Sequence, residues 1–323
     1  MVTVKDVAQH AGLSPSCVSK YFRDKNSVRN DSRVRIEAAV TALNYVPSDI
    51  ARSLRGKRSN TIKALMPLIT RPFFAEVFEY LHTPCRTAGY NLLLQTISAG
   101  ETFTSRDFAF ADGVIIAFPD DEKVIRQISG ILGETGKPIV CLLGHANAKD
   151  CTVVSVDISQ GMAEAAKYLL SSGRKRIAYV GGTDDSSPSS ERFRGFVSIV
   201  EPERRHMVFR RDFSLAWGFR AAQYMLANLP DGVLCENDSI AAGVISCFLA
   251  NGITVPGDVS VIGFDNTIIA ETYWPSITSV SIPTMEMAEV AVRSLLNAVS
   301  GKPVCNQEFQ SKLIVRESSS FRG

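Results

Sequence analysis

Residues 3–20, TVKDVAQHAGLSPSCVSK, predict two short helices joined by a tight turn. Gly12 is suited to end the first helix, because glycine tolerates the left-handed backbone found after helix C-termini. Ser14 is a good N-cap for the second helix, and Pro15 fits its first position, where a missing N–H costs nothing. Helix, three-residue turn and helix is the spacing of a helix-turn-helix. The apolar stripe of the first helix consists of Val4, Val7, Ala8 and Ala11.

A third helix is expected to complete this N-terminal unit. The sequence predicts it over about residues 31–44, beginning at Asp31 or Ser32. Together with the first stripe and with Val18 and Phe22 of the second helix, it supplies one small core. Its expected buried side chains are Val34, Ala38, Val40 or Thr41, and Leu43.

The segment after this core is basic and predicts one more short helix. Residues 49–55, DIARSLR, follow a break at Pro47, and residues 56–60 form a basic linker. A helix of this length is marginal in water, so DNA or a second subunit is needed to stabilise it. Residues 1–60 carry 11 Lys or Arg against 5 Asp or Glu, a net charge of +6, which leaves −4 for the rest. A basic head on an acidic body indicates a nucleic-acid partner.

Cysteine usage and the opening residues favour a cytoplasmic protein. The seven cysteines include no CxxC pair and are odd in number, so neither a metal site nor a disulfide framework is expected. The first six residues contain no apolar stretch, which predicts no secretory signal. No run of uninterrupted apolar residues approaches the length of a membrane span. We expect a cytoplasmic, nucleoid-associated protein without cofactor or metal.

The rest of the chain predicts strands that alternate with helices. Apolar strands begin near residues 62, 90, 113, 138, 153, 176, 232 and 259. This alternation is typical of parallel α/β sheets, and its length exceeds one ordinary sheet, which predicts two doubly wound lobes. We therefore expect a helix-turn-helix domain over 1–46, a hinge helix and linker over 47–60, and a two-lobed effector-binding and dimerisation domain over 61–323.

Polar residues at the strand ends predict a ligand-binding cleft. Ligands of such folds bind beyond the carboxyl ends of the strands. Asp157, Asn237 and Asp265 lie at such ends, and Arg192 follows another strand. An arginine and carboxylates suit neighbouring hydroxyl groups, each a donor and an acceptor, and so indicate a sugar or a ribose. Candidates for the apolar wall are Phe73, Phe74 and Phe213.

Simpler roles for these polar residues stay open. Asp265 can cap a helix, and Arg192 can form a surface ion pair. Asn237 and Asp238 can cap the helix expected over 239–250.

Residues 3–66 resemble the lactose-repressor/galactose-repressor (LacI/GalR) family of transcription regulators. The resemblance rests on TVKDVAxxAGLSxxxVSK, then RxRI/VxxAxxxLNYxP, then ARSLR, in this order. It implies that the second helix enters the major groove of DNA. It places Pro15, Ser16 and Lys20 at base-reading positions. It places Ser14, Cys17, Ser19 and Arg23 near the DNA backbone. A solvated helix face is the alternative for each of them.

The same resemblance implies a hinge helix over residues 48–55 that pairs with a second copy in the minor groove. Leu54 would separate a base step there, unless it is an ordinary packing leucine. Ala51, Arg52 and Arg55 would contact the DNA beside it.

The body resembles the sensor domain of this family, which is similar to periplasmic sugar-binding proteins. The matching runs cover residues 192–196, 236–241 and 255–266. The resemblance implies an effector cleft that contains Arg192, Asn237 and Asp265, with Phe74 at its mouth and Phe213 stacking on the ligand. Two segments depart from the family pattern, because residues 99–111 are too short for the usual helix and 198–212 are abbreviated.

These observations predict a sequence-specific, allosteric transcription regulator. We expect a repressor that binds a palindromic operator as a homodimer and responds to a sugar or related small molecule. The sequence contains no GxSxG, P-loop or HExxH motif and no GxGxxG after a strand, and its four histidines are isolated, so no enzyme is expected. The alternatives are a ligand-blind DNA-binding regulator and a sugar-binding protein without a regulatory role.

Overall fold

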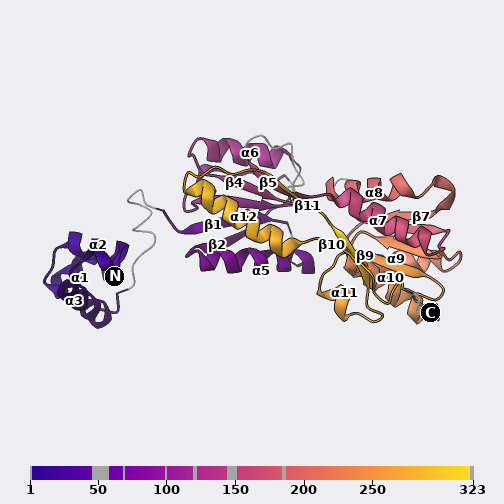
Figure 1. Cartoon of the computed structure of the whole chain (residues 1–323), viewed down its shortest axis with the longest axis horizontal. Helices are drawn as coiled ribbons and strands as arrows, with labels where there is room; N and C mark the ends of the chain where they lie inside the picture. Colours follow the sequence, from indigo (N-terminus) through magenta and orange to yellow (C-terminus); the bar gives the residue numbers. More distant parts are fainter. Residues whose placement is uncertain are drawn as a thin grey trace. The chain divides into compact units, whose positions relative to one another are not determined.

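The chain divides into two compact units, Met1–Ser59 and Asn60–Gly323, each with its own hydrophobic core (Figure 1). The computed structural model describes residues 2–45, 58–67, 70–98, 100–118, 122–143, 151–183 and 187–320. Within these ranges, no helix has both the length and the apolar character that crossing a bilayer requires.

The first unit consists of α1 (Val4–Ala11), α2 (Pro15–Arg23), η1 (Lys25–Ser27) and α3 (Asn30–Ala42). Its helix ends are capped as the sequence predicts. Thr3 and Asp6 form a capping box, in which the Thr3 N–H donates to the Asp6 carboxylate at 2.7 Å. Gly12 ends α1 with a φ of 61°, and Ser14 Oγ accepts from the Cys17 N–H at 3.2 Å. The expected helix-turn-helix is therefore present.

The third helix differs from the expectation in its start and its buried face. It begins at Asn30 rather than at Asp31 or Ser32. The stripe that packs into the core consists of Ile36, Ala39, Val40 and Leu43. Val34, Ala38 and Thr41, which were candidates for the inside, are exposed. The buried set keeps the i, i+3, i+4, i+7 spacing, and a change of one residue in phase turns a helical face by about 100°.

The first lobe of the second unit is a parallel sheet with strand order β11-β5-β4-β3-β1-β2. Its strands are β1 (Thr61–Met66), β2 (Asn91–Thr96), β3 (Gly113–Ala117), β4 (Ile139–Leu142), β5 (Thr152–Val156) and β11 (Gln307–Phe309). Helices α5 (Pro72–Thr87) and α12 (Thr284–Val299) pack together over one face (Figure 1). Helix α6 (Glu122–Gly133) and the short η2 (Ser105–Phe108) cover the other face.

The second lobe has strand order β12-β10-β9-β8-β6-β7, in which β12 runs antiparallel to β10. Its strands are β6 (Ile177–Gly181), β7 (Arg205–Arg210), β8 (Gly232–Cys235), β9 (Ser260–Asp265), β10 (Thr278–Ser281) and β12 (Lys312–Ile314). Helices α7 (Ile158–Ser171) and α8 (Ser187–Ile199) pack as one pair, and α9 (Leu215–Met225) and α10 (Asp238–Ala250) as another. The short elements are η3 (Pro202–Arg204) and α11 (Ile268–Thr272). Two doubly wound lobes are thus confirmed.

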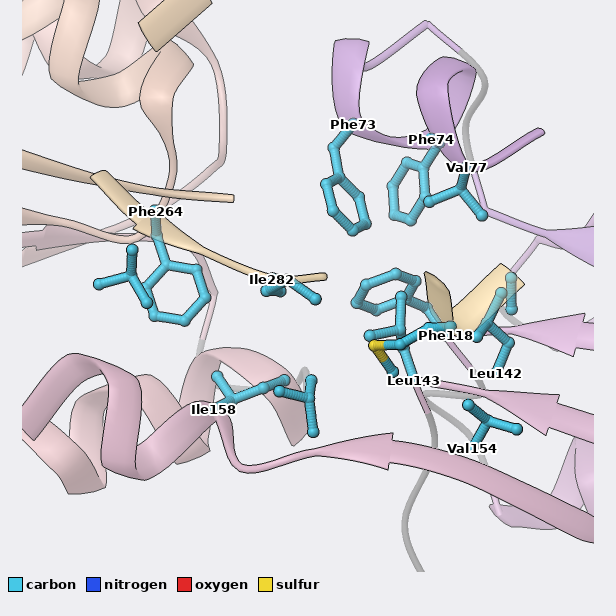
Figure 2. Packing of buried hydrophobic residues seen from close by; sticks show 14 of the residues in the cluster. Phe73, Phe74, Val77, Phe118, Leu142, Leu143, Val154, Ile158, Phe264 and Ile282 are labelled. Atoms are coloured by element: carbon cyan, nitrogen blue, oxygen red, sulfur yellow. The ribbon is translucent and has the colours of Figure 1, made fainter. Parts of the chain in front are cut away.

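The chain passes between the lobes three times. It leaves β5 for α7, returns from β10 to α12, and leaves again from β11 to β12. One continuous hydrophobic cluster follows these crossovers. In Figure 2, Phe73, Phe74 and Phe118 of the first lobe lie on one side of Ile282, and Phe264 lies on the other.

The shortened segment at 99–111 contains η2 in place of a full helix, as its length predicts. Two lysines donate hydrogen bonds to carbonyl groups of this segment. The Lys63 ammonium group donates to the Asp107 carbonyl and lies 5.1 Å from the centre of the Phe108 ring. Lys137 Nζ donates to the Phe108 carbonyl at 2.7 Å. The abbreviated 198–212 segment forms η3 and the edge strand β7.

Helices α9 and α10 approach to backbone contact because two positions lack a side chain. A Cβ atom at Gly243 would lie 2.1 Å from the Leu215 carbonyl oxygen, and one at Gly218 would lie 2.1 Å from the Ile240 carbonyl oxygen. Both carbonyl oxygens belong to the helix backbone, so they cannot move away from an added Cβ atom unless a helix shifts.

We expect Gly243→Ala to destabilise the second unit by about 1–3 kcal/mol, because the added methyl group overpacks a backbone contact. Gly130→Ala is the matched control. Gly130 lies on an exposed position of α6, where an added methyl group would have nothing within 4 Å, so this variant should gain about 0.5–1 kcal/mol of helix propensity. Urea unfolding of both variants measures the difference. Equal stability of the two would contradict the close α9–α10 contact.

Candidate functional site

A cleft of about 70 Å³ lies between the two lobes of the second unit. Its walls follow the carboxyl ends of strands in both sheets, where ligands bind in folds of this class. The first lobe contributes Arg71, Pro72, Phe73, Phe74 and Phe118. The second lobe contributes Pro188, Arg192, Phe213, Asn237, Asp238, Ser239, Asp265 and Thr267. Six of the seven expected ligand-binding residues therefore come together here.

A buried ion pair joins two of these side chains. Arg192 Nη2 donates to Asp265 Oδ1 at 2.9 Å, and the two side chains are 6% and 8% exposed. The guanidinium carbon lies 4.4 Å from the centre of the Phe264 ring. The surface ion pair that was open for Arg192 is therefore wrong. Removing one partner of such a pair costs about 3–5 kcal/mol, because the other charge stays buried.

Arg192 keeps one donor for a further group. Its Nε atom is buried and has no hydrogen-bond partner among the described residues. A buried donor without an acceptor costs about 1–3 kcal/mol. Arg192 as a residue also lines the cleft, so its guanidinium group contributes positive charge and donors to this wall.

Asp265 is held in an uncommon backbone conformation. Its φ is 91°, and that of Asn266 is 54°, both in the region that favours glycine. Such conformations cost of order 1–3 kcal/mol and persist where the surroundings fix them. Burial raises the pKa of Asp265 to about 6, although Arg192 opposes this shift. The N-cap of α11 is Thr267, so the helix-cap role that was open for Asp265 is wrong.

Asp238 is a second buried carboxyl group at this wall, and its oxygens are occupied. Oδ2 accepts from the Thr267 N–H at 2.7 Å and from the Thr267 hydroxyl at 2.9 Å. Oδ1 accepts from the Ser279 hydroxyl at 2.6 Å. Burial and the nearby Asp265 raise the pKa of Asp238 to about 7. Asp238 therefore ties α10 to the loop after β9 and to β10.

Asn237 serves as a helix cap and as a support for the cleft. Its Oδ1 accepts from the Ile240 N–H at 2.7 Å, which makes it the N-cap of α10, as the simpler alternative proposed. Its Nδ2 donates to the Phe213 carbonyl at 3.1 Å. The cap therefore also positions the aromatic residue of the opposite loop.

Aromatic rings form the apolar wall. Phe73 and Phe74 meet the Phe118 ring edge to face, with centroids 5.1 and 5.2 Å away (Figure 2). The guanidinium carbon of Arg71 lies 4.5 Å from the centre of the Phe213 ring, a contact between the two lobes. Gly182 makes room for this ring, because a Cβ atom there would lie 2.1 Å from Phe213 Cζ.

Asp157 lies outside the group of cleft-lining residues. It is exposed and N-caps α7, with Oδ1 accepting from the Gln160 N–H at 2.8 Å. It follows β5, as expected, but the chain continues there directly into the crossover to the second lobe. The side chain consequently completes a helix end instead of facing the cleft.

A hydrogen bond near the cleft also connects the lobes. The Ile268 N–H at the start of α11 donates to a carboxylate oxygen of Glu76 on α5 at 3.0 Å. Burial raises the pKa of Glu76 above its ordinary range. This contact depends on the relative position of the two lobes, because each contributes one partner.

The helix-turn-helix exposes three expected base-reading residues. Pro15, Ser16 and Lys20 are exposed on α2, whereas Cys17 and Ser19 are partly buried. Ser14 is exposed too, but its hydroxyl already caps α2. The core of the unit lies on the opposite side of α2, around Val18 and Tyr21. The DNA-binding candidates at Ala51, Arg52, Leu54 and Arg55, and the Arg23 side chain, lie outside the described part of the chain.

Sequence reasoning missed several cleft residues, among them Arg71, Phe118 and Thr267. Each follows a strand directly or begins the next helix. The rule for polar residues that selected Asp265 would also have selected Thr267, whereas Phe118 is at a strand end but is apolar. No local pattern identifies Arg71, because its role depends on Phe213 in the other lobe.

Comparison with known proteins gives matches for both units. Residues 3–48 match the family described as bacterial regulatory proteins, lacI family, and residues 166–319 match a periplasmic binding protein-like domain. The HTH-type transcriptional repressor PurR of Photobacterium profundum is 29% identical, with 98% of each chain covered. The first unit is therefore a lacI-family domain of bacterial regulatory proteins, and the second contains a periplasmic binding protein-like domain. The expected family is thus confirmed.

Other transcription regulators are similar to this chain over nearly its whole length. The ribose operon repressor of Halalkalibacterium halodurans is 29% identical over 99% of this chain and 97% of its own. A lac repressor dimer bound to operator and an anti-inducer has a TM-score of 0.86, with 23% identity and coverage of 98% and 99%. A transcriptional regulator CelR–cellobiose complex has a TM-score of 0.70 at 25% identity, with coverage of 99% and 100%. The two curated relatives are both named as repressors.

The raised pKa of Asp238 predicts a pH dependence of stability. A carboxyl group whose pKa is higher in the folded state stabilises the fold fully below its ordinary value of 3.8, and this contribution is lost as pH rises through about 7. Asp238→Asn keeps the shape without the charge. We expect the free energy of unfolding of the wild type, relative to this variant, to fall by about 2–3 kcal/mol from pH 5 to pH 8. Urea titrations at several pH values measure it. A constant difference would show that Asp238 is already ionised in the fold at pH 5, which contradicts the raised pKa.

Proposed function

We propose that this protein is a transcriptional repressor that binds a palindromic operator as a homodimer and is controlled by a sugar or a related small molecule. The observation that carries the proposal is the buried Arg192–Asp265 pair with its unoccupied donor, in a chain that also contains a helix-turn-helix with an exposed α2. Because its target is chromosomal DNA, the protein would act at the nucleoid in the cytoplasm.

The exposed face of α2 supports the DNA-binding half of the proposal. The described residues provide no hydrogen bond or ion pair to the Lys20 ammonium group, and this side chain is exposed. Lysine can donate to guanine O6 and N7 in the major groove. Ser16 and Pro15 on the same exposed turn would contribute a short hydroxyl and an apolar contact. In helix-turn-helix proteins the first residues of the second helix contact base edges, which supports this role for Pro15 and Ser16.

The cleft supports the effector half. Asp265 supplies an acceptor, the Arg192 guanidinium group supplies donors, and Phe73, Phe74 and Phe213 supply apolar faces. This combination binds a ring with neighbouring hydroxyls. The ribose operon repressor and the CelR–cellobiose complex are relatives whose names include a sugar.

Control of DNA binding would follow from the position of the lobes. The Glu76–Ile268 hydrogen bond and the Arg71–Phe213 contact join the two lobes beside the cleft. A ligand that favours one arrangement of the lobes would shift the population of that arrangement, and with it the DNA affinity, by its preference between the two. The hinge residues 47–60 would transmit this change to the helix-turn-helix.

Lys20→Ala tests the proposed base contact. We expect weaker operator binding by about 1–3 kcal/mol and relaxed preference at one base pair, because a bidentate contact to guanine is lost. Lys5→Ala on α1 makes the same change of charge and should leave base preference unchanged. Selection of binding sites from a random DNA library, followed by titration at fixed salt, measures both effects. Equal losses on operator and random DNA for Lys20→Ala would contradict the role.

Asp265→Asn tests the effector site. A thermal-shift screen against mono- and disaccharides, sugar phosphates and nucleosides first identifies a ligand, which should stabilise the wild type by about 2.7 kcal/mol at one hundred times its dissociation constant. Asp265→Asn should lose this shift and the ligand response of DNA binding, while it still binds operator. Glu203→Gln, an exposed charge change on η3, is the control. An unchanged response in Asp265→Asn would place the effector elsewhere. A screen without any hit would favour a ligand-blind regulator.

A further inference from the structure

Two cysteines lie in contact on neighbouring strands of the first lobe. Cys141 is on β4, and Cys151 directly precedes β5. The β4–β5 register pairs Val140 with Thr152 and Cys141 with Val153, so both cysteines lie on the same face of the sheet. Their sulfur atoms are 2.8 Å apart. A disulfide bond is about 2.05 Å long, so bond formation would require only a small movement.

The environments of the two thiols differ. Cys141 is 1% exposed and packs in the core beneath α6, whereas Cys151 is partly exposed at the edge of that core. Contact with Cys151, together with burial, raises the pKa of Cys141 well above its ordinary range. An accessible cysteine beside a protected partner is the arrangement of oxidation-sensitive thiols, in which the first is oxidised and the second resolves it.

The sequence did not predict this contact, because the two cysteines are not in a CxxC motif. Nine residues separate the two cysteines, and only the parallel pairing of β4 with β5 brings them together. Cys17, Cys85, Cys235, Cys247 and Cys305 contribute no comparable sulfur pair among the described residues. The contact is therefore specific to one place in the fold.

We propose that Cys141 and Cys151 form a site of reversible oxidation, which a hydroperoxide converts to a disulfide. The Cys151 thiolate attacks the terminal peroxide oxygen, the O–O bond breaks, and the alcohol or water leaves, so that Cys151 becomes a sulfenic acid. The Cys141 sulfur then attacks the Cys151 sulfur and displaces water. Two thiols and one hydroperoxide give one disulfide, one alcohol or water, and one further water. A dithiol reductant reverses the change.

The position of the pair connects this chemistry to the lobes. From Cys151 the chain runs along β5 and crosses into α7 of the second lobe. From Cys141 it continues into Leu142 and Leu143, which belong to the cluster that contains Phe118 of the cleft (Figure 2). A disulfide would tie the amino end of β5, the strand that leads into the first crossover, to β4, which leads into the cluster at the cleft.

Peptide mapping of the oxidised full-length protein tests the proposal. Lys149 lies between the two cysteines, so trypsin separates them into the peptides 127–149 and 150–167. After treatment of the reduced, folded protein with hydrogen peroxide and alkylation of the remaining thiols, we expect these two peptides to be linked. The link should be lost on incubation with dithiothreitol, and the two thiols should become available to alkylation again.

Two variants make the result specific. Cys151→Ser should leave Cys141 as an unmodified thiol at the same peroxide dose, because no sulfenic acid forms beside it. Cys305→Ser removes an exposed thiol elsewhere and should leave the linked peptides unchanged. Recovery of both cysteines as thiols, or of Cys151 as sulfinic acid without a link, would overturn the proposal. So would links from Cys151 mainly to cysteines other than Cys141.

Discussion

The carboxyl ends of two parallel sheets are joined by three crossovers, and this constraint positions everything at the cleft. Parallel strands leave all their carboxyl ends at one edge of a sheet, and the loops that follow are free to carry polar side chains. In this chain both edges border one space, because the chain passes from β5 to α7, from β10 to α12 and from β11 to β12. The continuous hydrophobic cluster along these crossovers holds the two sheet edges beside each other.

The charges at this edge are placed where water cannot screen them. Arg192 lowers the pKa of Asp265, but burial of the carboxyl group has the larger effect, so this pKa is raised although a guanidinium group contacts it. A pair of this kind contributes little net stability compared with apolar packing. Its retention at the wall of a cleft is consistent with binding rather than with folding.

Periodicity and capping residues predicted the elements whose local signals are strong. The helix end at Gly12, the N-cap at Ser14, most strands of the first sheet and half of those in the second could be assigned from the sequence. The face of α3 could not, because Val34 and Ile36 fit different helical stripes and only packing against α1 and α2 selects one. Helices α8, α9 and α12 and strands β7, β10, β11 and β12 were not predicted at all.

The site was predictable where a residue follows its own strand, and unpredictable where its role needs a distant partner. Asp265 and Asn237 belong to the first kind. Arg71 belongs to the second, since its contact is Phe213 in the other lobe. Asp157 satisfied the strand-end rule but became a helix cap, because β5 continues into a crossover instead of a loop.

The short segment around η2 depends on a lysine in the middle of a strand. A full helix satisfies its own carbonyl groups, whereas a shortened segment needs donors from elsewhere. Lys63 and Lys137 supply them to the Asp107 and Phe108 carbonyls. Lys63 is the charged residue of the apolar strand TIKALM, and the carbonyl group of Asp107 explains how a buried ammonium group is tolerated there. A longer helix in place of η2 that satisfied its own carbonyl groups would leave this ammonium group buried without its acceptor.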